Sequence, residues 1–85
     1  MARSRRVYYQ GWQDQRPGWT RRVKWFRGET DIRLNFCDLN ERRECNVFYR
    51  GEDRVERATR DFDRFKAGTV TVKMLMDERD ERKDG

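Results

Sequence analysis

Apolar and polar side chains alternate with a period of two over residues 19–27, 31–37 and 45–50, a pattern typical of strands with one buried face. An earlier stretch, residues 5–12, is rich in Val, Tyr and Trp, which favour strands, and turn residues follow it. The sequence therefore predicts four strands in the first 50 residues.

The loop between the second and third stretches predicts a hairpin. Gly28-Glu29 fits a two-residue type II′ loop, which would pair Arg27 with Thr30. The same register places Trp25 opposite Ile32, so apolar residues meet across the two strands. Loop chemistry and apolar pattern therefore agree on this hairpin.

The two cysteines flank the next hairpin loop, and its register decides whether they meet. A turn centred on Glu41 would place Cys37 opposite Cys45 and permit a disulfide, but it would also pair apolar residues with polar ones. A shift of one residue pairs Phe36 with Val47 and puts the cysteines on opposite faces. We therefore expect two free thiols without a function.

The second half of the chain changes period. Residues 52–67 repeat apolar side chains at helical spacing, and Gly68 supplies a stop, so a helix is predicted there. Residues 69–76 alternate Val and Met with other residues and predict a last strand. Residues 77–85 contain no apolar side chain and are predicted to be a disordered charged tail.

The element order is then β-β-β-β-α-β. It predicts an α+β fold, a curved antiparallel sheet of four to five strands with one helix packed on one face. Residues 1–76 form the single expected domain, with residues 1–5 as a basic arm. This order is similar in topology to small modules that bind single-stranded nucleic acid, among them the purine-rich-element and Whirly-type folds, over about residues 5–67.

Composition adds a strong charge bias to this small core. The chain has 85 residues, 44% of them charged, and a net charge of +5. Residues 1–27 hold eight basic side chains against one acid, Asp14, so the basic character belongs to the first third. A core of this size often needs a partner for stability, so we expect one.

The sequence offers little for catalysis or for a cofactor. It has no histidine, a single serine (Ser4), two cysteines and no glycine-rich phosphate loop. No apolar run has the length of a signal peptide core or a membrane span. We therefore expect a non-enzymatic cytoplasmic protein without cofactor or metal, and no partner in a membrane.

The predicted registers give the sheet an inner face towards the helix and an outer face towards solvent. Trp19, Val23 and Trp25 belong to the inner face. The outer face collects cations, aromatic rings and amides, namely Arg22, Lys24, Phe26, Arg33, Asn35, Asn46, Phe48 and Arg50, and Tyr9 of the first strand is expected to join them. Cations offset phosphates and exposed rings stack on unpaired bases, so RNA or single-stranded DNA is the expected ligand, bound with low sequence specificity.

Two other interpretations of the outer face remain open. Antiparallel sheets often expose one polar face that has no ligand. Arginine and aromatic residues also dominate protein interfaces, which would suit a phage-type regulator or inhibitor, a minor subunit of a larger assembly, or a homodimer.

Overall fold

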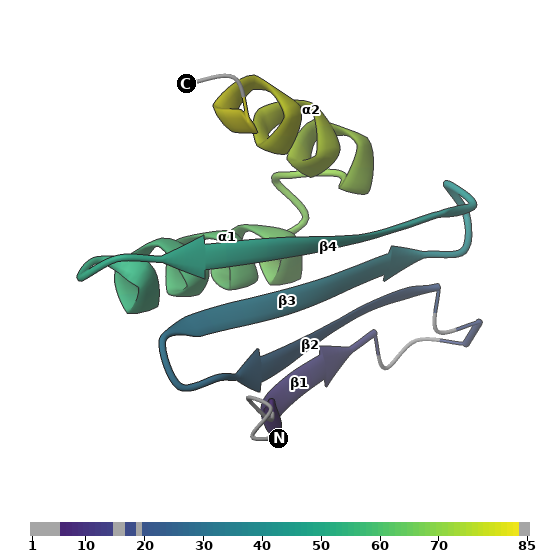
Figure 1. Ribbon diagram of the computed structural model, residues 1–85. Helices are drawn as coiled ribbons and strands as arrows, with labels where there is room; N and C mark the ends of the chain where they lie inside the picture. Colours follow the sequence, from purple (N-terminus) through teal and green to yellow (C-terminus); the bar gives the residue numbers. More distant parts are fainter. Residues whose placement is uncertain (1–5, 15–16, 19, 84–85) are drawn as a thin grey trace.

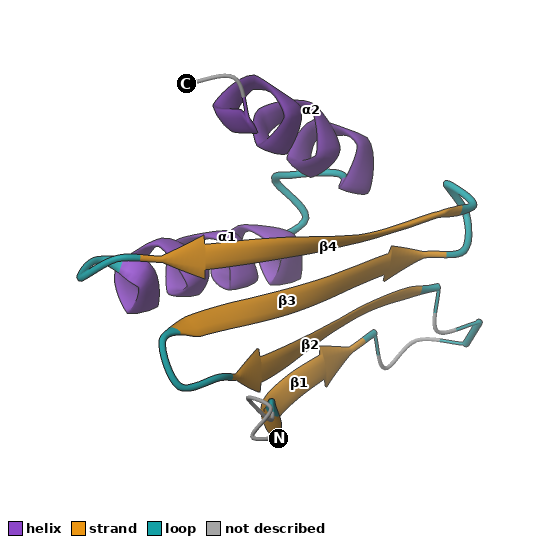
Figure 2. Ribbon diagram, in the orientation of Figure 1, coloured by secondary structure: helices purple, strands orange, loops and turns teal. Residues whose placement is uncertain are grey.

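A four-stranded antiparallel sheet followed by two helices makes up the fold (Figures 1 and 2). The computed structural model describes residues 6–14, 17–18 and 20–83. The elements are β1 (Val7–Gln13), β2 (Arg21–Arg27), β3 (Asp31–Asp38), β4 (Arg43–Arg50), α1 (Arg54–Ala67) and α2 (Val72–Lys83). The strands lie side by side in chain order, with β1 and β4 at the edges. The α+β class and the four strands are therefore confirmed.

The core lies between the inner face of the sheet and the two helices. Trp25 of β2 packs edge-on against Phe62 of α1 at 5.7 Å between ring centroids, and Phe36 of β3 meets Phe65 in the same way at 5.1 Å. Val23 and Trp25 face inward as predicted. The predicted inward position of Trp19 lies outside the described residues.

The helix α1 differs from the predicted stripe at two positions. Ala58, Phe62 and Phe65 are buried as the helical spacing predicts. Val55 is instead exposed, whereas Asp61 is fully buried. Gly68 ends the helix in the left-handed conformation, with φ of 80°, because a residue without a Cβ adopts it at no steric cost.

Both hairpin registers differ from the prediction by two residues. Arg27 pairs with Ile32 rather than Thr30, and the loop between the two strands spans residues 28–30. The carboxylate of Asp31 folds back into the space that a Cβ on Gly28 would fill, which gives this glycine a role other than a type II′ turn. A shift of two keeps every side chain on its predicted face, because strand side chains alternate with a period of two.

In the second hairpin, Phe36 pairs with Cys45 rather than Val47. Cys37 pairs with Glu44, so the two cysteines lie on opposite faces, and both are free thiols as expected. Burial raises the pKa of the Cys45 thiol to about 11. At neutral pH this thiol is therefore a protonated part of the core.

The predicted last strand over residues 69–76 is wrong, because α2 begins at Val72. The Thr71 hydroxyl accepts a hydrogen bond from the Met74 amide, as an N-cap does, at 3.1 Å. The Glu41 carboxylate, from the β3–β4 loop, accepts the amide protons of Val72 and Lys73, each at 3.1 Å. A side chain distant in sequence thus completes the cap of α2.

The helix α2 also continues over residues 77–83, which the sequence assigned to a disordered tail; residues 84–85 lie outside the described residues. Figure 1 shows α2 beside β4, whereas α1 lies behind the sheet. Arg79 of α2 donates a hydrogen bond to the Asn46 carbonyl of β4 at 2.8 Å. The prediction of one helix is therefore corrected to two. Within the described part of the chain, no helix is long and apolar enough to cross a membrane.

Candidate binding face of the sheet

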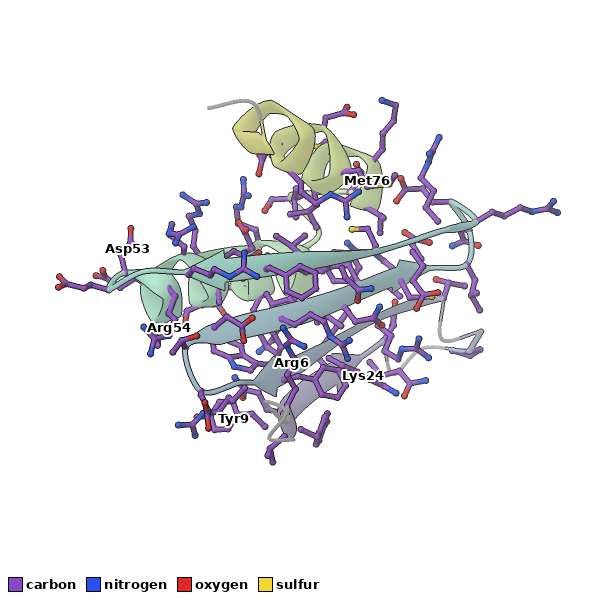
Figure 3. The ribbon with its side chains drawn as sticks, in the orientation of Figure 1. Arg6, Tyr9, Lys24, Asp53, Arg54 and Met76 are labelled. Carbon is purple, nitrogen blue, oxygen red and sulfur yellow. The ribbon has the colours of Figure 1, made fainter. Side chains whose placement is uncertain are left out.

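The outer face, opposite α1, carries the predicted site residues of β2, β3 and β4. The strand register brings Phe26 and Phe48 to either side of Arg33, and Lys24 beside Asn35. Arg22 and Arg50 lie towards opposite ends of the face. Figure 3 looks onto this face, where Arg6 and Lys24 lie over the strands. No helix covers it in this view.

A row of rings and one guanidinium crosses the sheet, one residue from each strand. In strand order it consists of Tyr8, Phe26, Arg33 and Phe48, and we call it the stacking row. The Tyr8 and Phe26 rings meet edge-on at 5.8 Å, and the Arg33 guanidinium carbon lies 4.4 Å from the Phe26 centroid. With strands about 4.8 Å apart, the row is about 14 Å wide. It therefore offers several flat surfaces in one line.

Tyr8 stands in the place that the sequence assigned to Tyr9. A β-bulge between Tyr8 and Gln10 shifts the register by one residue. The Tyr9 ring is thereby turned to the inner side, where it lies 5.5 Å from the Trp25 ring. The prediction for Tyr9 is therefore corrected. The sequence contains one sign of this bulge, Gly11, because a glycine inside a strand often marks a bulge.

The carboxylate of Asp31, at one end of the face, is engaged by two arginines. It lies 2.7 Å from the Arg6 guanidinium and 4.0 Å from that of Arg50. Arg6 and Arg50 also lie near the Phe48 ring, at 5.1 Å and 5.9 Å from its centroid. Sequence reasoning placed Arg6 at the start of the predicted first strand but did not include it among the candidate site residues.

The remaining cations of the outer face are available for a ligand. Arg22, Lys24 and Arg33 form no ion pair with the residues that the structure describes. The Nε atoms of Arg22 and Arg33 are covered and have no hydrogen-bond partner there. The face therefore has a positive charge that its own carboxylates leave uncompensated.

The amides of the face are paired with one another. Asn35 donates to the Asn46 side-chain oxygen at 2.9 Å and to the Glu44 carboxylate at 3.1 Å. Both donor positions of this amide are thus in use. Asn35 therefore stiffens the middle of the face more than it offers donors to a ligand.

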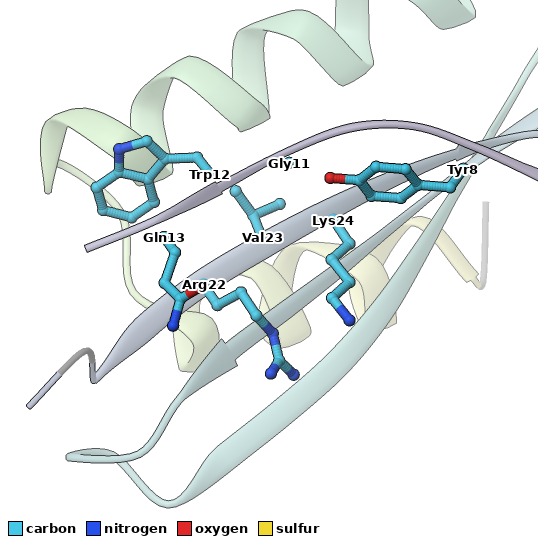
Figure 4. A pocket seen from close by; sticks show the side chains of 7 residues that line it. All are labelled: Tyr8, Gly11, Trp12, Gln13, Arg22, Val23 and Lys24. Atoms are coloured by element: carbon cyan, nitrogen blue, oxygen red, sulfur yellow. The ribbon is translucent and has the colours of Figure 1, made fainter. Parts of the chain in front are cut away.

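A hollow of about 260 Å³ adjoins the stacking row, between β1 and β2 (Figure 4). It is lined by Tyr8, Gly11, Trp12, Gln13, Arg22, Val23 and Lys24. The Tyr8 hydroxyl lies only 2.6 Å from where a Cβ on Gly11 would be, so the ring rests in the space that this glycine leaves. The bulge and the glycine together shape the hollow.

On the inner side, a buried polar network joins β4 to both helices. The Tyr49 hydroxyl donates to Asp61 at 2.6 Å, and Arg64 donates to the other oxygen of Asp61 at the same distance. Arg64 also reaches Glu78 of α2 at 3.2 Å. All of these contacts lie on the core side, so they stabilise the fold rather than form part of the outer face.

No protein-family model, no curated protein and no solved structure matches this chain. Within the described residues, no three Cys, Asp or Glu side chains lie close enough together to hold a metal ion. The candidate site is therefore defined by the geometry and the charge of the outer face alone.

Proposed function

We propose that the protein is a non-enzymatic binding protein that holds RNA or single-stranded DNA on its outer face, with low sequence specificity. One observation carries this proposal: the stacking row lies on the sheet face opposite α1, and Arg33 within it and Arg22 and Lys24 beside it form no ion pair with the described residues. Exposed aromatic rings stack on unpaired bases, because the faces of bases within a duplex are already stacked on neighbouring bases.

Each group has a task in this proposal. Phe26 and Phe48 stack on bases, and the planar guanidinium of Arg33 stacks beside them. The cations offset backbone phosphates, a contribution that carries no sequence information. Because the Asn35 amide is already paired, few free donors remain to read base edges, which agrees with low specificity.

Fluorescence anisotropy with a labelled ten-nucleotide single strand tests the proposal. Binding is expected at about 50 mM salt and should weaken steeply towards about 200 mM, because counterions compete for the phosphates. Phe48→Ala is expected to raise Kd about 5- to 150-fold, the equivalent of about 1 to 3 kcal/mol for one stacked base.

Met74→Ala is the matched control, because Met74 of α2 is 44% exposed and Phe48 is 43% exposed. It removes a similar exposed apolar side chain from α2, outside the stacking row, and should leave Kd unchanged. Absence of binding at low salt, or an equal effect of the two variants, would refute the proposal.

A protein partner is the second candidate, and the edge strand β1 favours it. Val7 and Tyr9 are exposed along this edge, at 64% and 53%. Exposed edge strands pair readily with another strand, so a second copy of the chain is the simplest partner. Light scattering distinguishes a monomer from a dimer, because association of two copies through β1 would double the mass of 10.5 kDa.

A further inference from the structure

The hollow between β1 and β2, of about 260 Å³, has room for an oxyanion and the charge to bind one. Its lining contains two cations, Arg22 and Lys24, and no carboxylate. In Figure 4 the Arg22 and Lys24 side chains extend to the same side of the sheet, and the Tyr8 hydroxyl points along β1 towards Gly11. A guanidinium, an ammonium and a phenol therefore border one concave surface.

These donors match a phosphate group in their chemistry. A guanidinium presents parallel N–H groups to two oxygens, an ammonium acts as a point charge, and a phenol donates a single hydrogen bond. The Arg22 Nε is covered and has no partner among the described residues. An anion bound in the hollow would give the Arg22 guanidinium an acceptor, and the described residues provide none for its Nε.

The position of the hollow relates it to the stacking row. Lys24 and Phe26 lie two residues apart on the same side of β2, about 6.8 Å along the strand. Tyr8 borders the hollow and is also the first member of the row. A nucleotide whose phosphate lies at Lys24 therefore has its base within reach of the Tyr8 and Phe26 rings.

We propose that this hollow is the phosphate position of the single-strand site, in which Arg22, Lys24 and the Tyr8 hydroxyl hold one backbone phosphate of the bound strand. The proposal rests on the proposed function. The inference assigns a position to one phosphate of the bound strand, which lies in the hollow, while the other phosphates contact the open face.

The salt dependence of strand binding tests this inference. Removal of one phosphate contact lowers the slope of log K against log salt by about 0.7 for a single strand. Arg22→Gln and Lys24→Gln are each expected to lower the slope, and together by no more than about 0.7, because both side chains hold the same phosphate. Lys24→Arg should keep the full slope. Phe48→Ala should weaken binding with an unchanged slope, because it removes stacking and no phosphate contact.

Lys66→Gln is the control for the loss of one charge, because Lys66 is exposed on α1, away from the outer face. The slope of log K against log salt for Lys66→Gln should equal that of the unmodified protein. Circular dichroism melts confirm that each variant is folded. If the protein binds the strand while Arg22→Gln and Lys24→Gln keep the full slope, the hollow is not a phosphate site and the proposed function stands. If no strand binds at low salt, both proposals fall.

A free phosphate ion has the same chemistry as a backbone phosphate, so inorganic phosphate is added in a separate titration at constant ionic strength. The ion and the strand should compete for the hollow, so inorganic phosphate is expected to raise Kd for the unmodified protein and to have less effect on Lys24→Gln. If phosphate shifts the Lys24 amide resonance while Kd stays constant, the hollow binds the free ion and its assignment to the strand is wrong.

Discussion

Trp25→Ala is expected to destabilise the protein severely. The Trp25 side chain is 4% exposed and contacts Phe62 of α1 at 5.7 Å and Tyr9 of β1 at 5.5 Å between ring centroids, so it joins the edge of the sheet to the helix. Truncation of a buried tryptophan to alanine costs about 3 to 5 kcal/mol. A domain of this length has about 4 to 13 kcal/mol of stability in total. The loss is thus a large share of the whole.

Urea denaturation followed by circular dichroism measures this effect, and Phe26→Ala is the matched control. Phe26 is the next residue on β2, but its ring lies on the half-buried outer face. We expect Phe26→Ala to unfold near the urea midpoint of the unmodified protein and Trp25→Ala to unfold at a much lower urea concentration. Equal losses for the two variants would contradict the division of β2 into an inner and an outer side.

Asp61→Ala is expected to lower the free energy of unfolding nearly as much as Trp25→Ala does. The cause is the loss of electrostatic contacts and not of packing. Asp61 is fully buried and accepts hydrogen bonds from Tyr49 and Arg64. Its removal takes one hydrogen-bond acceptor from the buried Tyr49 hydroxyl and one of two carboxylates from Arg64, which retains Glu78. Removal of one partner from a buried pair typically costs about 3 to 5 kcal/mol. The partial exposure of Arg64 favours the lower end of this range.

Asp63→Ala is the matched control. A comparison of the urea midpoints of Asp61→Ala and Asp63→Ala shows whether the loss of stability comes from the buried network or from the removal of any carboxylate. Asp63 lies two residues further along α1 and is exposed. Asp63→Ala should change the free energy of unfolding by less than about 0.5 kcal/mol, as surface substitutions usually do. Similar midpoints for both variants would show that the buried carboxylate adds nothing to stability.

The alternation of apolar and polar residues predicted the face of each strand residue better than the loop residues predicted the strand register. Alternation placed Trp25, Lys24 and Phe48 on their correct faces, because a face is decided by odd or even position alone. Loop chemistry failed at Gly28, since the Asp31 carboxylate occupies the space beside it and the turn is longer than two residues. The outer face was therefore predictable although each register was wrong by two.

One error came from a contact that a local pattern does not contain. The alternation of residues 69–76 resembles a strand, but Val72 and Leu75 also have helical spacing and both are buried. The cap that decides for a helix includes Glu41, about thirty residues earlier in the chain. A second error came from the bulge before Gln10, which places Tyr8 instead of Tyr9 on the outer face and has Gly11 as its local sign.

Amide chemical-shift mapping of the isotope-labelled protein tests the central claim most directly, because it locates a bound single strand residue by residue. We predict that addition of a ten-nucleotide strand at low salt shifts the amides of Lys24, Phe26, Arg33 and Phe48 most, and leaves those of α1 nearly unchanged. No shifts at saturating strand, or shifts concentrated on α1 and α2, would contradict binding at the outer face.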